Sequence, residues 1–287
     1  MPSTIPSAPA ACALPLAANT LCIRRNRVAS GGWGALIGLL GGLIGLGGAE
    51  FRLPVLVMAF RLPTLEAVIL NKAMSLVVVA AALVFRGGSI PFATLLGHAD
   101  VALNLLAGSL FGAWWAAGHA LTMSGRRLNQ AVMALLAGLA LLVLIEAWAG
   151  IGTPGAPLLA DPGPRNAAGV LAGFAIGVVA ALLGVAGGEL LIPTIVLLFG
   201  VDIKLAGSLS LLVSLPTMVV GFARYRSSAT FAVVVRERLL FRWMAAGSVV
   251  GAGIGGLLLG FVPTGYLVSA LGVILLLSAV KTYRHAH

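Results

Sequence analysis

The sequence predicts an all-α polytopic membrane protein made of two repeats of inverted topology. Each repeat is expected to be a glycine- and proline-broken, re-entrant helical hairpin followed by three transmembrane helices. Three observations lead to this fold class. The 287 residues are 60% hydrophobic and only 9% charged, with mean hydropathy +1.09, whereas soluble domains are about 25% charged. Apolar runs of roughly 20 residues, the length that crosses a bilayer, recur along the chain. One broken segment also occurs twice.

This broken segment reads GALIGLLGGLIGLGGAEFRLPVLVMAF at residues 34–60 and GFAIGVVAALLGVAGGELLIPTIVLLF at residues 173–199. One offset of 139 positions relates the two copies and places Gly45 on Gly184, Gly48 on Gly187, Glu50 on Glu189 and Pro54 on Pro193. The same offset places the Ala-Gly-Ser of residues 107–109 on that of residues 246–248. We therefore predict an internal duplication.

The N-terminal tail, residues 1–32, is rich in Ala, Pro and Ser and then becomes basic at Arg24, Arg25 and Arg27. In a secretory signal the positive charge comes before the apolar region, so this order argues against one. The arginines are expected to hold the tail in the cytoplasm. Cys12 and Cys22 have no CxxC spacing and no nearby histidine, so we expect neither a metal site nor a structural disulfide.

Repeat 1 is expected to cover residues 33–149, and repeat 2 residues 167–287. The Gly- and Pro-rich connector of residues 150–166 would separate them. After the broken segments, the full spans are expected at residues 65–85, 99–123 and 128–148 in repeat 1, and at residues 203–222, 243–261 and 266–283 in repeat 2.

The placement of arginine predicts the topology. If each broken segment enters and leaves the membrane on one face, Arg61, Arg126, Arg127 and the arginines of residues 224–242 all fall inside, as the positive-inside rule requires. A full crossing would put Arg126 and Arg127 outside. Three crossings per half then invert the second copy and leave both termini in the cytoplasm. Two equal half-helices would each be about 20 Å long.

The glycine turns of the broken segments predict an anion site. Glycine permits positive φ and leaves its N–H uncovered, and Pro54 and Pro193 are expected in the first turn of the second half-helix. Helix N-termini attract anions, so two hairpins entering from opposite faces would aim at one central site. Close helix packing is the alternative use of such glycines.

Glu50 and Glu189 are the second indication of a site. A carboxylate at mid-membrane costs at least about 2.5 kcal/mol, so it is normally protonated, paired or functional. A buried carboxyl that takes up a proton together with an anion would couple the two. For Glu50, pairing with Arg52 or Lys72, or capping of the half-helix, is the alternative.

The helices that follow the broken segments add polar candidates. Lys72 could be either an anion ligand or the partner of Glu50, and serine in a membrane helix often bonds its own backbone. His98 and His119 lie near the ends of one span, where interfacial histidines are expected rather than a proton relay. The substrate-binding candidates from these helices are Asn71, Lys72, Ser75, Ser210 and Ser214.

The paired motifs GLIGLGGAEFRLPVL and ALLGVAGGELLIPTI resemble those of the TauE/SafE family of sulfite exporters, also called the toluene-sulfonate uptake permease group. The resemblance implies a bacterial inner-membrane carrier for sulfite, sulfonates, other sulfur oxyanions or related organic acids. The chain departs from the commoner glycine run at Ala49 and Ala186. By position, the implied substrate-lining residues are Gly45, Gly47, Gly48, Pro54, Gly184, Gly187, Gly188 and Pro193.

The sequence therefore predicts a secondary anion transporter with no cofactor or metal. The alternatives are an anion channel or a structural subunit without transport. An enzyme is not expected, because HExxH, GxSxG and P-loop patterns are missing. The net charge of +10 is spread between apolar segments, so nucleic acid is not an expected partner. The glycine-lined residues 107–118 would suit either a homodimer or packing within the monomer.

Overall fold

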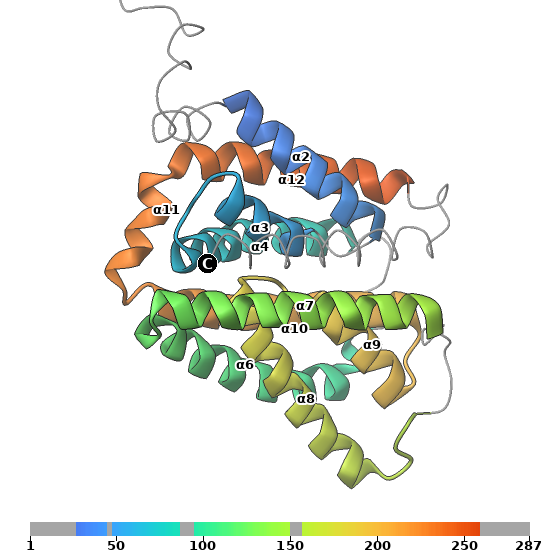
Figure 1. Cartoon of the computed structure of the whole chain (residues 1–287). Coiled ribbons are helices and arrows are strands. Elements are labelled where there is room, and N and C mark those ends of the chain that lie inside the picture. The colour runs from blue at the N-terminus through green and yellow to red at the C-terminus, as the bar shows by residue number, and fades with distance from the viewer. Residues whose placement is uncertain (1–26, 45–47, 87–94, 150–156, 259–287) are drawn as a thin grey trace, which may run out of the picture.

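The computed structural model describes residues 27–44, 48–86, 95–149 and 157–258, and this part of the chain is helical and contains no strand. The elements, shown in Figure 1, are α2 (Arg27–Ile44), α3 (Ala49–Met58), α4 (Thr64–Arg86), α6 (Ala99–Thr122), α7 (Gly125–Ala149), α8 (Pro162–Leu183), α9 (Gly188–Phe199), α10 (Ile203–Tyr225), the 3-10 helix η2 (Ala229–Ala232), α11 (Val233–Arg236) and α12 (Arg238–Leu258).

Within the described residues, four helices are long and apolar enough to cross a membrane: Thr64–Leu83, Ala99–Thr122, Pro162–Leu183 and Leu205–Tyr225. The largest apolar core is formed by buried side chains of α3, α4, α6, α7, α8 and α12. These features confirm the predicted all-α polytopic membrane fold. The last predicted span, residues 266–283, lies outside the described residues.

The two broken segments are each split into two helices at the predicted glycines. Gly48, Gly184 and Gly187 have φ of 70°, 68° and 76°, which glycine adopts without strain. A Cβ on Gly48 would stand 2.4 Å from the carbonyl oxygen of Ile37, and one on Gly184 would stand 2.4 Å from that of Val68. Both the backbone conformation and the close packing therefore require glycine here.

The predicted position of the prolines is wrong. α3 and α9 begin at Ala49 and Gly188, directly after the left-handed glycines, so Pro54 and Pro193 lie inside these helices rather than in their first turns. The positive-φ glycine determines where each helix starts. Because proline has no N–H, neither proline can donate to the carbonyl four residues earlier. Those carbonyls belong to Glu50 and Glu189.

The prediction of arms of about 20 Å is also wrong for the first helix of each hairpin. α2 has 18 residues, which corresponds to about 27 Å, and it begins at Arg27, inside the predicted N-terminal tail of residues 1–32. α8 has 22 residues, which corresponds to about 33 Å, and it begins before the predicted start of the broken segment. α8 runs obliquely to α7 and α10 (Figure 1). The N–H of Leu158 donates to the carbonyl of Leu197 at 2.9 Å, so the chain leaves α9 close to where it enters α8.

The same packing occurs twice, and in each case a broken helix lies against a helix of the other half. α2 packs on α12, and α8 packs on α6. At both contacts, a Cβ on a glycine would collide with a backbone carbonyl oxygen, at 2.2–2.3 Å. The equivalent glycine–carbonyl contacts are Gly34 with Met244 and Gly173 with Leu105, then Gly38 with Ser248 and Gly177 with Ser109. All four obey the 139-residue offset, which supports the predicted duplication.

The equivalent helices α4 and α10 run antiparallel, as the course of the chain in Figure 1 shows. Lys72, in the first half of α4, lies close to Gly221, near the end of α10: a Cβ added to Gly221 would stand 2.8 Å from Cε of Lys72. At the same level, Lys72 donates to the carbonyl of Ala180 and Tyr225 donates to that of Ala181. Antiparallel equivalents are what inverted repeats require, so these contacts support the inversion, which stays a prediction.

We expect Gly38→Ala and Gly177→Ala each to destabilise the protein by about 1–3 kcal/mol. The added Cβ would stand 2.2 Å from the carbonyl oxygen of Ser248 in the first case and 2.3 Å from that of Ser109 in the second. Unfolding of the purified protein in detergent measures the change. Gly138→Ala in α7 is the control, because its Cβ would have no neighbour within 4 Å. Equal stability of all three variants would contradict the described packing.

Candidate functional site

The two helix breaks bring Glu50 and Glu189 together in the interior. Both glutamates lie in the first turn of their half-helices, and they are only 2% and 5% exposed. Their carboxyl groups are in hydrogen-bonding contact with each other. Since an ionised carboxylate only accepts hydrogen bonds, the two groups can bond to each other only when one of them carries a proton.

Arg52, two residues further along α3, is completely buried. Its guanidinium Nη1 donates to Asn71 Oδ1 at 3.4 Å and to Ser75 Oγ at 3.2 Å, and Nη2 donates to Ser248 Oγ at 3.2 Å. Glu50 acts on it electrostatically, but the hydrogen bonds in the described part all go to neutral groups. Arg52 therefore joins α3, α4 and α12 around a buried positive charge.

Asn71 connects the two helix breaks. Its Nδ2 donates to the carbonyl of Ala49, at the start of α3, and to the carbonyl of Leu183, at the end of α8, both at 3.1 Å. One side-chain amide on α4 thus satisfies backbone groups from both halves, which a membrane interior could not satisfy otherwise.

Lys72 is also completely buried. Its Nζ donates to the carbonyl oxygen of Ala180 in α8 at 3.1 Å. No carboxylate forms a salt bridge with it among the described residues. Its contact is therefore with the second hairpin, not with Glu50.

The serine candidates differ from one another. Ser75 accepts a hydrogen bond from Arg52, whereas Ser210 donates to the carbonyl of Gly207 in its own helix at 2.8 Å. Ser214 is buried, and its hydroxyl has no partner among the described residues. Gly188 and Pro193 are partly buried in α9. The candidates Gly45 and Gly47 lie outside the described residues.

The sequence analysis missed two members of this cluster. Arg52 entered it only as a partner for Glu50, and Ser248 did not enter it as a site residue. The duplicated Ala-Gly-Ser triplet could have indicated Ser248, because the equivalent Ser109 is also buried. There Ser109 bonds Thr217 Oγ1 at 2.7 Å instead of an arginine.

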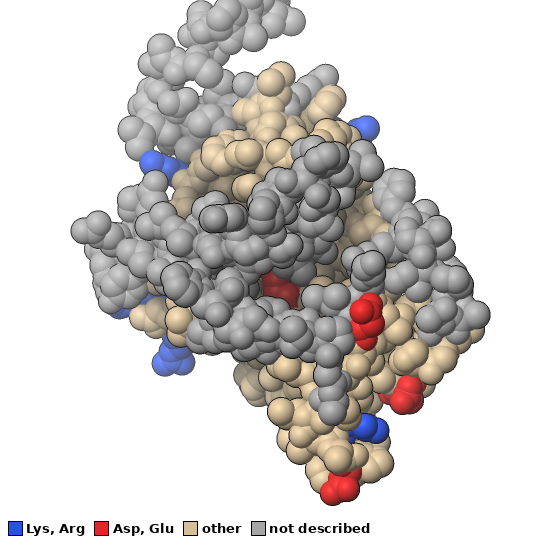
Figure 2. Space-filling view, turned by 90° about the vertical axis from the view of Figure 1, so that its right-hand side faces the viewer, with Lys and Arg blue, Asp and Glu red and all other residues tan. Residues whose placement is uncertain are grey.

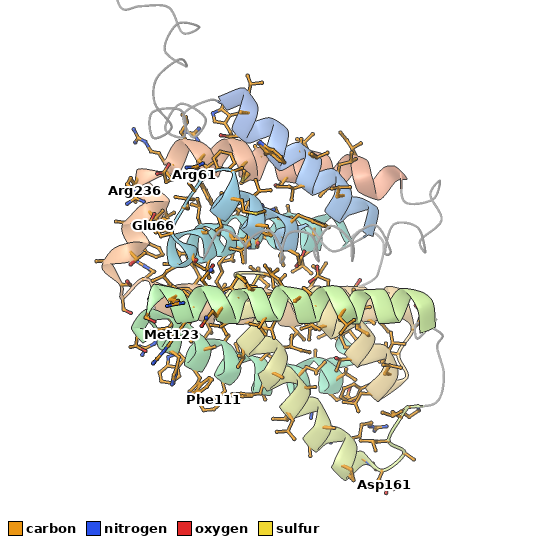
Figure 3. The ribbon with its side chains drawn as sticks, viewed as in Figure 1. Arg61, Glu66, Phe111, Met123, Asp161 and Arg236 are labelled. Atoms are coloured by element: carbon orange, nitrogen blue, oxygen red, sulfur yellow. The ribbon has the colours of Figure 1, made fainter. Side chains whose placement is uncertain are left out.

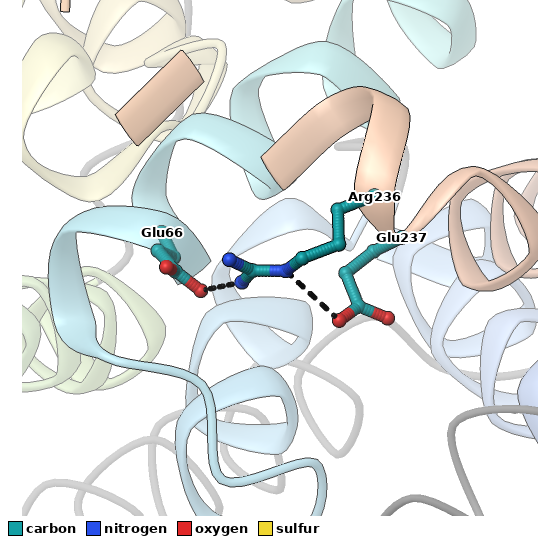
Figure 4. A network of polar contacts seen from close by, with 3 residues as sticks. All are labelled: Glu66, Arg236 and Glu237. Carbon is teal, nitrogen blue, oxygen red and sulfur yellow. Dashed lines mark hydrogen bonds and ion pairs between the residues drawn. The ribbon is translucent and has the colours of Figure 1, made fainter. Parts of the chain in front are cut away.

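Basic groups gather at one end of the molecule. Arg61, Glu66, Arg236 and Met123 lie at this end, and Asp161 lies at the other (Figure 3). Arg236 bonds the Glu66 carboxylate, and its Nε lies 3.6 Å from a carboxylate oxygen of Glu237 (Figure 4). The hydrogen bond to Glu66 raises the pKa of the Arg236 guanidinium, so this guanidinium stays charged at physiological pH.

The opposite end carries several acidic side chains on its described surface, as Figure 2 shows. Asp100, Asp161 and Asp202 begin or precede helices at this end, and all three are exposed. Among the described residues, these aspartates therefore lie at the end opposite Arg61 and Arg236, and the assignment of the two ends to the two sides of the membrane stays a prediction.

An all-α polytopic membrane protein whose duplicated, interrupted helices meet at buried charged groups has the architecture of secondary transporters. The chain belongs to the TauE/SafE sulfite exporter family, since the family model matches residues 10–143 and 168–287. The gap between these stretches contains the predicted connector. Membership indicates a membrane transporter of the sulfur-anion exporter type rather than an enzyme. No curated protein and no solved structure matches the chain.

We expect Asn71→Leu to destabilise the protein by at least about 2 kcal/mol. The change keeps the side-chain volume but leaves the buried carbonyl of Leu183, at the end of α8, without its donor, at about 1–3 kcal/mol, and removes a second hydrogen bond from the carbonyl of Ala49, which also accepts within α3. Chemical or thermal unfolding in detergent would measure the loss. Ser210→Ala at the equivalent position of α10 is the control and should cost less, because that hydroxyl bonds only its own helix. Similar losses in the two variants would argue against the bridge.

Proposed function

We propose that this chain is a secondary transporter of a small anion, namely sulfite, an organosulfonate or a related sulfur or organic anion, across the bacterial inner membrane. Transport is coupled to protons through Glu50 and Glu189. The observation that carries the proposal is the contact between these two glutamates, one from each repeat, in the interior of the molecule. A site at the junction of two repeats is accessible from either face when the repeats rock against each other.

The charge of the interior suits an anion. Among the described residues, four acidic and basic side chains are buried there: Glu50, Arg52, Lys72 and Glu189. When Lys72 is protonated, the two cations together with two carboxyls that share one proton leave a net positive charge. Such a charge inside a low-dielectric region attracts an anion strongly.

The helix starts support the coupling to protons. Glu50 accepts a hydrogen bond from its own backbone N–H, so its carboxyl occupies the positive end of α3, where an anion would otherwise bind. Glu189 lies equivalently at the start of α9. Protonation of the pair removes its negative charge and frees these helix ends for the substrate. A proton and an anion thus enter the site together.

Two inverted repeats, residues 33–149 and 167–287 joined by residues 150–166, provide the alternating access. The antiparallel α4 and α10 and the return of α9 to the start of α8 support hairpins that enter from opposite faces. The positive-inside rule assigns the arginine-rich end to the cytoplasm, together with both termini. The glycines of α6 pack on α8 within the chain, and the homodimer stays a prediction.

Gradient-driven uptake into proteoliposomes tests the function. Labelled sulfite, sulfate, thiosulfate, a sulfonate and a carboxylate are offered with and without an imposed pH gradient. We expect one of these anions to accumulate with the gradient, and Glu50→Gln or Glu189→Gln to reduce that accumulation at least about tenfold, because neither amide can take up the coupled proton.

Asp100→Asn, which removes an exposed acid at the start of α6, is the control and should transport as the wild type does. Uptake that ignores the pH gradient and survives both glutamine changes would leave an anion carrier without proton coupling. Absence of uptake of every anion would contradict the transport proposal itself.

Labelling of single cysteines tests the orientation. In a variant without Cys12 and Cys22, a cysteine replacing Arg61 should react with an impermeant maleimide only from the cytoplasmic side, because the first hairpin returns to the face that it entered. A cysteine replacing Asp161, at the other end of the molecule (Figure 3), should react only from outside. Labelling of both from the same side would contradict the proposed topology.

A further inference from the structure

We propose that Arg52, Ser75 and Ser248 form a recognition site for a single oxyanion group, and that the equivalent residues Leu191, Ser214 and Ser109 form none. The inference rests on the transport function proposed above and narrows its substrate class: the cargo presents at least two oxygen atoms on one charged group. Carboxylates, sulfonates and sulfite meet this condition, whereas halides do not.

Arg52 makes hydrogen bonds typical of a cation that has no anion bound to it. Its three partners are neutral and lie at 3.2–3.4 Å, whereas charge-assisted bonds to carboxylates are about 2.7–2.9 Å long. The Nε atom is buried and has no partner among the described residues. Hydrogen bonds to neutral groups offset only part of the desolvation free energy of a fully buried guanidinium. This position therefore favours the binding of an anion.

The shape of the site selects oxyanions. The guanidinium is a planar fork that donates two parallel hydrogen bonds to two oxygens of one group. Ser75 and Ser248 carry hydroxyls that now accept from Arg52. Ser248 donates its own hydrogen to the carbonyl of Gly34 at 3.2 Å, and this hydroxyl can exchange that bond for one to a third oxygen of the substrate. Asn71 uses both its amide hydrogens on backbone carbonyls, so it positions Arg52 instead of binding the substrate.

The set of equivalent positions lacks this site. The 139-residue offset places Leu191 on Arg52, Ser214 on Ser75 and Ser109 on Ser248. Leu191 is buried and apolar, and the hydroxyl of Ser109 bonds Thr217. The duplicated framework therefore retains both glutamates but only one arginine. The molecule would thus bind one oxyanion for each Glu50–Glu189 pair.

This asymmetry links the anion to the proton. Arg52 is close enough to Glu50 for the two charges to interact. An oxyanion bound to Arg52 would replace Glu50 as the negative charge that balances the guanidinium. It would also bring a second negative charge close to Glu50. Binding of a proton to the Glu50–Glu189 pair removes that repulsion. Anion and proton therefore favour each other's binding, with one proton passing to the carboxyl pair for each anion held by Arg52.

Equilibrium binding to the purified full chain in detergent tests the site. The probes are methanesulfonate, acetate, sulfite and chloride, and calorimetry or the shift of the unfolding temperature reports binding. We expect the oxyanions to bind and chloride not to. Arg52→Lys, which keeps the charge but loses the fork, should weaken oxyanion binding at least about tenfold, the equivalent of one hydrogen bond between charged groups.

A matched pair of serine variants gives a second test that does not depend on folding of the Arg52 variant. Ser248→Ala removes a hydroxyl that contacts Arg52 and should weaken methanesulfonate binding several-fold. Ser109→Ala removes the equivalent hydroxyl of the other half, which contacts Thr217, and should bind as the wild type does. Equal binding by Ser248→Ala and Ser109→Ala would overturn the site.

The pH dependence tests the link to the proton. Methanesulfonate stays ionised throughout, so a loss of affinity as pH rises, up to about tenfold per pH unit for one linked proton, reports the protein's own proton. Glu50→Gln should flatten this dependence. Affinity independent of pH in the wild type would overturn the link.

The two proposals fail in different ways. Wild-type binding of oxyanions without gradient-driven uptake would contradict the transport function and leave the binding site. Gradient-driven uptake with tight oxyanion binding in Arg52→Lys, or chloride binding as tight as that of methanesulfonate, would overturn the site and leave the transport function.

Discussion

The arrangement depends on one physical constraint, namely that backbone polar groups opened at a helix break must find partners inside the protein when they lie at membrane depth. Asn71 meets this constraint for both breaks at once, by donating to the carbonyls of Ala49 and Leu183. Because one amide serves both halves, the two hairpin tips must lie side by side. Their acidic residues, Glu50 and Glu189, are thereby brought into contact.

The buried charges follow from the same junction. A lone ion is costly in a low-dielectric interior, and four ionisable side chains are held here by neutral hydroxyls, an amide, backbone carbonyls and one another. Arg52 contacts side chains of α4 and α12, and Lys72 contacts a carbonyl of α8. Every charge therefore touches a helix other than its own. Relative movement of the two halves would change the partners of these charges, which suits a site that opens to alternate faces.

Symmetry and its violation have separate roles. The glycine contacts of α2 with α12 repeat in those of α8 with α6, so the framework is duplicated in its packing. The cations are not duplicated, since leucine occupies the positions equivalent to Arg52 and Lys72. Under the proposed function, a symmetric framework would give equivalent inward and outward states, whereas a single set of cations would give one substrate site.

The sequence by itself determined the fold class, the duplication and the helix breaks. The fold class follows from the composition, because so apolar a chain is stable only in lipid. The duplication follows from the shared offset between the two copies, which can be read without knowing the packing. The sequence also identified the buried glutamates, because a charge within an apolar run is costly wherever it is placed. It misplaced Pro54 and Pro193, because local preferences put proline in the first turn, whereas the positive-φ glycines start the helices in the structure.

Only the tertiary structure decided which side chains meet. Ser248 reaches Arg52 from a helix 196 residues away, and Asn71 reaches Leu183 across 112 residues. No periodicity within one segment encodes such contacts. They arise because each broken helix packs on a helix of the opposite half, and that exchange follows from the shape of the glycine-lined surfaces of both halves.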